Sequence, residues 1–326
     1  MGRHLSNYKN LLLLSSILLS FQSKSQELPL SSETIQLRDF QLDENKSDNL
    51  SSQMGKGKLK QIEVILVELT PGNQTEPHHH LAEELIYIIS GEGYTLIWNK
   101  AGGDKIQYNW SQGDMLSPTL NSWHQHVNLS NDKPARYLSL SSTPLTRNLF
   151  RDSEYLQSSD YVSEKRWQYS INQEPEYEPI ATEGMGVVRM RIGHQIKDLP
   201  GRKLQSRREN VLGITVRPEG DMAGNETMEW EVREYLTPDA SSPGHRHPWE
   251  VVYHIMGGEG YAILQTKDGP RRRVKWKQGD VFFVEADEYH RLIPLENSSP
   301  RIWQVKASGY FHNIGNLKIY DIDRDL

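Results

Sequence analysis

The sequence predicts an all-β protein made of two tandem barrels that are joined by a short helical connector. One motif recurs at an offset of about 166 residues, and a repeat of this length indicates two similar domains. The segments between the motif residues are short, rich in β-branched and aromatic side chains, and bounded by turn residues. With 24 Gly and 16 Pro among 326 residues, the chain has many turns and enough length for two cores.

The charge and the cysteine content exclude several classes of function. There are 37 Lys and Arg against 43 Asp and Glu, a net charge of −6, which argues against a nucleic-acid partner. The chain has 0 Cys, which excludes disulfides, zinc–thiolate sites, iron–sulfur clusters and thiol nucleophiles. Any metal must therefore be held by His, Asp or Glu. The expected partner is a small-molecule substrate, and the sequence leaves a homo-oligomer open.

Residues 1–25 have the layout of a secretory signal. Arg3, His4 and Lys9 precede an apolar run over residues 11–21, and the small residues Ser23 and Ser25 follow it. The apolar run is too short to span a bilayer comfortably, and the next segment is polar. We expect cleavage of this signal, no stable membrane span afterwards, and a secreted or periplasmic protein.

The repeated motif has three blocks and a final histidine. The first copy reads HHHLAEE at 78–84, GEGY at 91–94, WSQGD at 110–114, and His124. The second copy reads HRHPWEV at 245–251, GEGY at 258–261, WKQGD at 276–280, and His290. The offset is 167 residues in the first two blocks and 166 afterwards, so one residue is lost in the intervening hairpin.

The segments around these blocks predict the elements. Strands are expected at 62–67, 85–89, 94–98 and 281–284, a helix at about 145–166, and an acidic, Pro-containing linker at 173–179. The predicted organisation is a signal (1–25), an N-terminal arm (26–54), a first barrel (55–145), a helical and extended connector (146–204), a second barrel (205–312) and a C-terminal tail (313–326).

The histidines of the first copy predict a metal site. Alternate side chains of a strand share a face, so His78, His80 and Glu84 point the same way if one strand runs through them. His124, on a separate strand, could supply a third nitrogen. Three neutral imidazoles and a carboxylate suit a divalent transition metal with open coordination positions. We favour Fe2+, with Mn2+, Ni2+, Cu2+ or Zn2+ as alternatives, and the competing interpretation is a surface loop without metal.

The second copy is not equivalent. It keeps three histidines, which are His245, His247 and His290. Val251 stands in the carboxylate position, and strand parity turns Glu250 away from the histidine face. The triad is either a second metal site with three ligands or part of a barrel retained for structure. On its inward face, Trp249 and Tyr253 could form a wall of a substrate pocket, although core filling is the favoured interpretation.

These residues resemble the cupin superfamily. The first cupin motif is matched by Gly72-x5-His78-x-His80-x3-Glu84-x6-Gly91. The spacing of the second is kept by Gly113-x5-Thr119-x-Asn121-x2-His124-x3-Asn128, with Thr119 and Asn121 where the family usually has Pro and Gly. The chain therefore resembles a bicupin over residues 55–145 and 205–312. This resemblance implies two jelly-roll, or double-stranded β-helix, barrels with metal inside.

His126 is expected beside the metal site, because it shares a face with His124 and Asn128. It could be a catalytic general base, a hydrogen-bond donor to a bound substrate, or a structural core residue. Asn128 is a candidate pocket residue. The Trp-His-x-His-x-Asn run at 123–128 is similar to that of gentisate-type ring-cleaving dioxygenases, which usually lack the glutamate ligand that Glu84 supplies here.

Three functions remain open at this point. The favoured one is a metal-dependent oxygenase of a small oxygenated or aromatic carboxylic acid, in which His126 handles a proton. The second is a metal-dependent isomerase, lyase or decarboxylase of a sugar or organic acid. The third is a non-catalytic, secreted ligand-binding bicupin. The choice among them rests on fold analogy.

Overall fold

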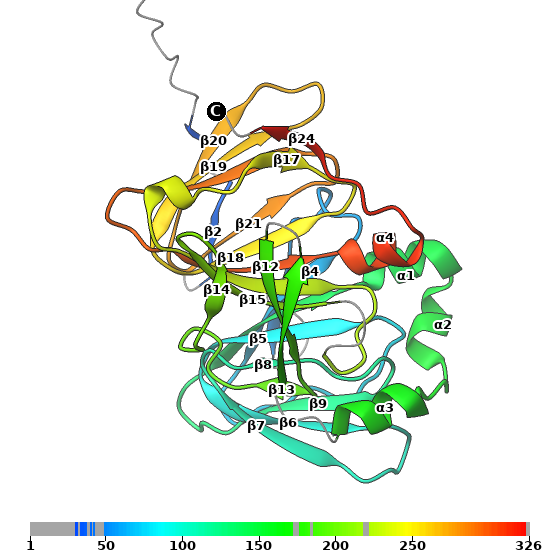
Figure 1. The fold of residues 1–326 in the computed structure, drawn as a ribbon. Coiled ribbons are helices and arrows are strands. Elements are labelled where there is room, and N and C mark those ends of the chain that lie inside the picture. The colour runs from blue at the N-terminus through cyan, green and yellow to red at the C-terminus, as the bar shows by residue number, and fades with distance from the viewer. Residues whose placement is uncertain are drawn as a thin grey trace, which may run out of the picture.

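The computed structural model describes residues 30–31, 33–37, 40, 42, 49–171, 176–182, 185–217 and 222–323. The expected signal at 1–25 lies outside these residues. Within the described ranges, no helix has the length and apolar character needed to cross a membrane. The described chain is mostly β-structure, as predicted, and Figure 1 shows the second barrel above the first, with helices α1, α2 and α3 along one side.

The first barrel consists of two antiparallel sheets. The larger has the order β13 (Gln195–Ile196), β8 (Met115–Leu116), β5 (Glu84–Ser90), β10 (Ala135–Ser141), β4 (Glu63–Leu69) and β3 (Leu50–Met54). The smaller has the order β7 (Ile106–Ser111), β6 (Glu92–Trp98) and β9 (Trp123–Asn128). The strands predicted at 62–67, 85–89 and 94–98 are confirmed as β4, β5 and β6.

The second barrel repeats this arrangement. Its larger sheet has the order β11 (Glu176–Thr182), β12 (Met185–Arg191), β15 (Val211–Val216), β16 (Glu229–Tyr235), β23 (Arg301–Lys306), β18 (Val251–Gly257), β21 (Asp280–Val284) and β2 (Ile35–Gln36), and β14 (Gln205–Arg208) pairs with β15. Its other sheet has the order β1 (Leu30–Ser31), β20 (Arg272–Lys277), β19 (Glu259–Gln265), β22 (Tyr289–Pro294), β17 (Gly244–Arg246) and β24 (Tyr320–Asp323). A short 3-10 helix, η1 (Pro238–Ala240), and helix α4 (Ser308–Asn313) complete it.

The connector differs from the single helix that was expected at 145–166. It forms three short helices, α1 (Thr143–Phe150), α2 (Ser153–Ser158) and α3 (Glu164–Ile171). The break after α1 has a local cause, because Arg151 adopts a left-handed conformation with φ 53° and Asp152 caps α2 by accepting the Tyr155 N–H. The linker prediction at 173–179 is wrong for residues 176–179, which lie in β11.

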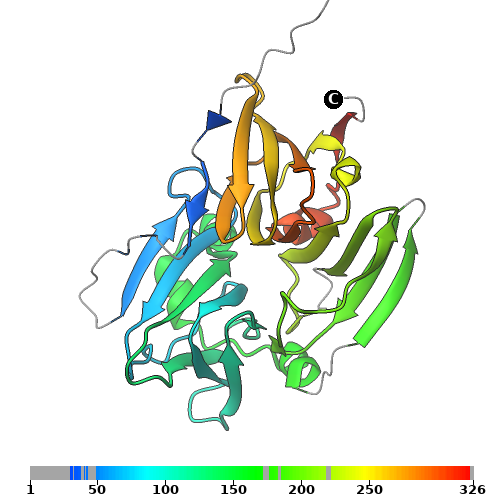
Figure 2. The same ribbon diagram turned by 90° about the vertical axis from the view of Figure 1, so that its left-hand side faces the viewer.

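Both ends of the described chain contribute strands. In the N-terminal arm, β1 and β2 pair with the second barrel, whereas β3 pairs with the first. Figure 2 shows these blue strands running between the orange strands of the second barrel and the light-blue strands of the first. In the C-terminal segment, β24 pairs with β17. Strand formation in both segments was not predicted, and the partners of β1, β2 and β24 lie far away in the sequence.

The repeated Gly-Glu-Gly-Tyr block has the same packing role in each barrel. Gly93 of β6 lies against the Trp110 ring, and Gly260 of β19 lies against the Trp276 ring. A Cβ atom at either glycine would stand 2.4 Å or less from the indole, which is closer than a real contact allows. Each motif therefore pairs a glycine with a buried tryptophan, and this explains why the two blocks repeat together.

Two equivalent glutamates join the barrels. The Glu83 carboxylate of the first barrel accepts backbone N–H groups from the second barrel, Glu226 at 2.9 Å and Thr227 at 2.7 Å, and also pairs with Arg166 at 2.7 Å. The Glu250 carboxylate of the second barrel accepts backbone N–H groups of the first, those of Lys60, Gln61 and Ile62, at 2.5, 2.8 and 3.1 Å. Both glutamates are buried, so these contacts stabilise the relative position of the barrels.

Candidate metal centre

The three histidines of the first motif come together, although not on one strand as expected. Strand β5 begins only at Glu84, and His78 and His80 lie in the preceding loop. His78 is held in place by a two-residue bridge to β9, in which it donates its N–H to the His124 carbonyl and accepts the His124 N–H. The ligand atoms of His78, His80 and His124 lie within 4.8 Å of one another.

Each imidazole is oriented by a backbone carbonyl. The Nδ1 atoms lie 2.7 Å from the Glu76 oxygen for His78, 2.8 Å from the Ala82 oxygen for His80, and 3.0 Å from the Ser122 oxygen for His124. A carbonyl oxygen only accepts, so each Nδ1 carries the hydrogen and each Nε2 keeps its lone pair. This arrangement prepares three nitrogen donors for a metal.

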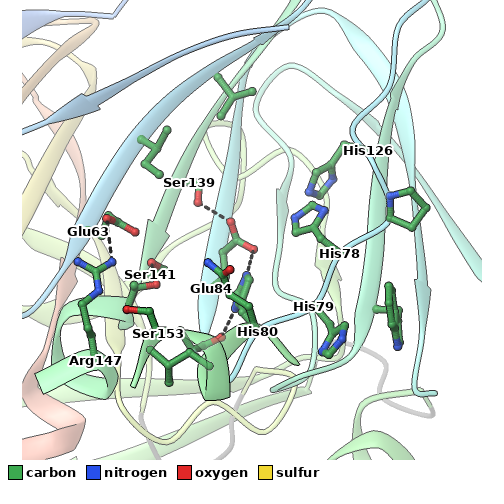
Figure 3. Close-up of a pocket in the computed structure, with 18 of the residues that line it drawn as sticks. Glu63, His78, His79, His80, Glu84, His126, Ser139, Ser141, Arg147 and Ser153 are labelled. Carbon is green, nitrogen blue, oxygen red and sulfur yellow. Dashed lines mark hydrogen bonds and ion pairs between the residues drawn. The ribbon is translucent and has the colours of Figure 1, made fainter. Parts of the chain in front are cut away.

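Glu84 supplies the carboxylate. Its Oε2 atom lies 3.4 Å from Nε2 of both His80 and His124, and its Oε1 atom accepts a hydrogen bond from the Ser139 hydroxyl. Figure 3 shows the Glu84 carboxylate between Ser139 and His80, with the His78 ring facing it. His79 is used differently, because its Nδ1 lies 3.0 Å from the Asn121 side-chain oxygen and its ring packs on Trp123.

The residues fit a metal ion. Glu84 Oε2 and His124 Nε2 are both buried and have no hydrogen-bond partner, which is costly unless a cation binds them. Ligand atoms about 2.1 Å from one ion and at right angles are about 3 Å apart, which is close to the 3.4 Å between Glu84 Oε2 and the Nε2 atoms of His80 and His124. Three nitrogens and one carboxylate oxygen suit a divalent transition metal.

The protonation states favour metal binding. Burial, assisted by His124, lowers the pKa of His78 to about 3. Burial alone would raise the pKa of Glu84, but the imidazoles of His124 and His80, 3.4 Å away, lower it well below its usual value. Burial acts to lower the pKa of His80, and the Glu84 carboxylate outweighs it and raises that pKa. At neutral pH, His78 is therefore neutral and Glu84 is ionised, as ligands must be.

His126 lies beside this cluster, as predicted. It is 2% exposed, and its ring centroid is 5.6 Å from that of His124 and 5.0 Å from that of Tyr137. Its Nδ1 lies 2.8 Å from the Thr95 hydroxyl oxygen, which also accepts the Trp110 indole N–H at 3.0 Å.

This pair of contacts defines the His126 tautomer. Because Trp110 can only donate, the Thr95 hydroxyl hydrogen is free to be donated to Nδ1, which leaves the ring hydrogen on Nε2. Burial lowers the pKa of His126 well below its usual value, so the ring is neutral. Of the roles considered from the sequence, this tautomer fits a hydrogen-bond donor better than a general base.

The cluster opens into a cavity of about 800 Å³. One wall is apolar and includes Ile65, Val67 and Leu156, whereas Ser139 and Ser141 lie beside Glu84 (Figure 3). Helix α1 contributes a cation, Arg147, which lies 3.8 Å from Glu63 and has a side chain that is 51% exposed. The cavity thus combines a cluster of candidate metal ligands, an apolar wall and one cation.

Asn128 does not line this cavity, contrary to our expectation of a pocket residue. Its amide nitrogen donates to the carbonyls of Leu69, Thr70 and Lys133, and its oxygen accepts the Ser130 N–H. The side chain stabilises the loop between β9 and β10. Its place in the motif therefore has a structural reason.

The second barrel also brings its histidines together. The ligand atoms of His245, His247 and His290 lie within 4.8 Å of one another, and each Nδ1 faces a backbone carbonyl, as in the first barrel. The Trp249 ring is stacked on His247 at 4.3 Å, and the Tyr253 ring is stacked on Phe282 at 4.8 Å. Both aromatic side chains are buried, which supports the core interpretation.

Sequence reasoning missed several residues of the site. Thr95, Ser139 and Arg147 lie outside the repeated motifs, and each reaches the site through tertiary packing. A comparison of the two repeats carries a signal for one of them. At the positions of Thr95 and His126, the second barrel has Ala262 and Leu292, so this polar pair belongs to the first barrel alone.

Comparison with known proteins agrees with the fold. Residues 65–141 match the family described as a cupin domain. The acireductone dioxygenase of Yarrowia lipolytica is 24% identical over 123 residues, which cover 37% of this chain and 67% of that protein.

Solved bicupin structures are similar over most of the chain. The oxalate decarboxylase of Lactobacillus farciminis, in a formate complex, aligns with a TM-score of 0.56 and 13% identity over 85% of this chain and 86% of that one. Salicylate 1,2-dioxygenase from Pseudoaminobacter salicylatoxidans, with gentisate, aligns with a TM-score of 0.59 and 13% identity over 83% and 76%. The predicted tandem jelly-roll fold is therefore confirmed, and at this identity the likeness concerns the fold alone.

Proposed function

We propose that this bicupin is a metal-dependent dioxygenase whose first barrel binds a small aromatic or oxygenated carboxylic acid. One observation carries the proposal: His78, His80, His124 and Glu84 converge, beside a neutral His126, on a cavity of about 800 Å³ with a cation on its wall. We propose Fe2+ as the metal, held by these three histidines and Glu84. The metal would hold the substrate and O2 in adjacent positions and polarise them.

Glu84 sets the charge of the site. Its carboxylate is the single anionic ligand, so a divalent metal bound there keeps one net positive charge. An anionic substrate is therefore attracted. The Ser139 hydroxyl, bonded to Oε1, leaves Oε2 directed at the histidines.

His126 positions the substrate. With its hydrogen on Nε2, it can donate a hydrogen bond to a substrate oxygen beside the metal ligands. The Trp110–Thr95 contacts maintain this tautomer without a charged group. The second barrel lacks both Thr95 and His126, and there the Trp276 indole nitrogen is buried without a hydrogen-bond partner. The barrel with a complete ligand set is thus also the barrel with this hydrogen-bond donor.

Arg147 and the apolar wall indicate the substrate class. The Arg147 guanidinium is half exposed and only weakly held by Glu63, so it can turn to a substrate carboxylate. Ile65, Val67 and Leu156 offer a surface for a ring or hydrocarbon. A cavity of about 800 Å³ is larger than a two-carbon acid needs, which favours a ring-sized substrate.

The test combines metal content with O2 uptake. Protein purified without oxygen is loaded with Fe2+ and assayed against hydroxylated benzoates, for the wild type and for Glu84→Ala and His290→Ala. We expect uptake in the wild type and in His290→Ala, and loss of both first-barrel iron and uptake in Glu84→Ala. Full uptake by Glu84→Ala would contradict the proposal.

A second candidate is a metal-dependent decarboxylase or lyase that uses the same residues without O2. The Glu84 carboxylate in the ligand set and the structural likeness to oxalate decarboxylase favour it. Release of CO2 from carboxylic acids under strictly anaerobic conditions would support this candidate over the dioxygenase. Binding of the same acids without turnover under either condition would instead support a ligand-binding protein. Export of the protein stays a prediction from residues 1–25.

A further inference from the structure

We propose that the second barrel binds a divalent metal together with a small carboxylate anion, which takes the place of the missing glutamate ligand. The proposal concerns His245, His247 and His290, and it is independent of the reaction in the first barrel. It follows from a reversal of charge between equivalent positions of the two barrels.

The reversal begins beside the lost ligand. In the first barrel, Glu84 is paired in register with Ser141 of β10. In the second barrel, Val251 is paired with Lys306 of β23. The anionic ligand beside a neutral hydroxyl is therefore replaced by an apolar residue beside a cation.

The next pair in the same register changes as well. Ser139, whose hydroxyl holds Glu84, is paired with Ile86, and the equivalent pair in the second barrel is Gln304 with Tyr253. Gln304 is 4% exposed, and its amide nitrogen is buried without a hydrogen-bond partner. A buried N–H group of this kind favours an acceptor, and a carboxylate oxygen is one.

Strand β16 adds further charge. Ile65 and Val67 of β4 line the metal cavity of the first barrel, and the register places Glu231 and Arg233 of β16 at their positions. The interior face of the second barrel is therefore charged where that of the first is apolar.

These charges do not cancel. Glu231 is 1% exposed and pairs with Arg207 at 2.7 Å, with Arg233 at 2.7 Å and with Lys306. Lys306 also lies 2.9 Å from Glu229, so three cations share two carboxylates. Lys306 is paired in register with Val251, the residue at the position of Glu84, which places this excess positive charge near the triad.

A bound metal makes an anion necessary. Three neutral imidazoles would not offset a divalent ion, and its charge would add to the excess of the cluster inside a buried barrel. A small carboxylate meets each requirement, because one oxygen can ligate the metal while the other accepts from Gln304 or Lys306. The structure therefore points to a site whose metal affinity depends on an anion.

The test uses Mn2+ and formate, which binds free Mn2+ only weakly. First-barrel binding is removed with His80→Ala/Glu84→Ala, and Mn2+ is titrated into this apo-protein in a non-coordinating, low-chloride buffer, with and without saturating formate. We expect formate to lower the dissociation constant for Mn2+ at least tenfold. Mn2+ bound with 13C-formate should show a carbon hyperfine coupling in pulsed EPR.

Matched variants separate the effect of formate as a metal ligand from other effects of formate on Mn2+ affinity. Val251→Glu, added to the same background, supplies the carboxylate, so Mn2+ should bind tightly without formate and should show no 13C coupling. Lys306→Met should weaken the formate effect. The first barrel, measured in His245→Ala/His290→Ala with its own ligands intact, should bind Mn2+ independently of formate. An affinity that formate does not change, an absent 13C coupling, or no Mn2+ binding in saturating formate would each overturn the proposal.

Discussion

Glu83 and Glu250 are equivalent residues of the two barrels, and each carboxylate accepts backbone N–H groups from a loop of the other barrel. Both carboxylates are directed at the other barrel and away from the histidines, as the sequence predicts for Glu250. Glu83 directly precedes the ligand Glu84, and Glu250 precedes Val251. In the sequence, one of these contacts is therefore one residue away from the candidate ligand Glu84, and the other is three residues away from His247.

Replacement of Glu250 should destabilise the whole molecule. In Glu250→Ala, three backbone N–H groups of residues 60–62 lose their acceptor. Since leaving a buried group unsatisfied costs about 1–3 kcal/mol, we expect a loss of about 3 kcal/mol or more in the free energy of unfolding. Denaturant unfolding measures it, with the exposed Glu259→Ala as a control. A loss below about 1 kcal/mol would show that water replaces the carboxylate.

Thr95→Val tests the positioning of His126. Valine keeps the shape of threonine but loses the hydroxyl that contacts His126 and Trp110. We expect kcat of the dioxygenase reaction to fall by about tenfold or more with unchanged metal content, since one positioned hydrogen bond contributes about 1–3 kcal/mol. In a double-mutant cycle, Thr95→Val should cause no further loss in His126→Asn. Additive losses would contradict the relay from Thr95 to His126.

Arg147→Gln tests the recognition of a carboxylate. Loss of the guanidinium should raise KM for a carboxylic acid substrate by about tenfold or more, because a charge-assisted hydrogen bond contributes about 1.5–3 kcal/mol. The KM for a neutral amide analogue should change little. Lys165→Gln, an exposed cation on α3, serves as the control for general charge effects. Equal changes for acid and amide would exclude direct contact between Arg147 and the carboxylate.

The pH dependence of stability tests the burial of His194. Its Nδ1 lies 2.8 Å from the Tyr108 hydroxyl oxygen, and its Nε2 lies 2.8 Å from the Thr119 hydroxyl oxygen. Burial lowers the pKa of His194 from 6.5 to about 3. Between these values, the unfolded chain binds a proton and the folded chain does not. The contribution of neutral His194 is therefore complete above pH 6.5 and is lost as the pH falls towards 3.

The measurement is the free energy of unfolding of metal-free protein from pH 5 to pH 8. His194→Gln should reduce its slope below pH 6.5 by one proton per molecule. An unchanged slope in His194→Gln would mean that His194 is protonated in the folded state.

The sequence predicted the barrels and the grouping of the candidate metal ligands because both depend on short-range pattern. The repeated blocks carry His78, His80 and Glu84 at fixed spacing, and their grouping is correct even though the strand begins only at Glu84. Arg147 and Thr95 could not be predicted as site residues, because helix packing and cross-strand pairing bring them there.

Two wrong predictions have local causes. Strand alternation puts Asn128 on the same face as His124, but its side chain is bonded to the end of β4, at the Leu69 carbonyl, and to the turn after β9, at Lys133 and Ser130. The predicted linker at 173–179 contains two prolines, which disfavour a strand. Residues 176–179 nevertheless pair with β12 as part of a hairpin, and no short-range pattern in the sequence predicts this pairing.

The N-terminal arm also bears on how the chain can fold while it is being made. Leu30 of β1 is paired with Arg273, and Ile35 of β2 with Val281. Both strands are synthesised early, and they stay unpaired until residues more than 240 positions later in the chain have been synthesised. Such distant pairings close late, because loop closure must precede any gain from the contact. The first barrel can assemble most of its strands during synthesis, but the edge of the second stays open until almost the whole chain has emerged. A nascent chain of this protein therefore exposes unpaired strands for longer than a one-barrel chain would, and such strands favour aggregation during that interval.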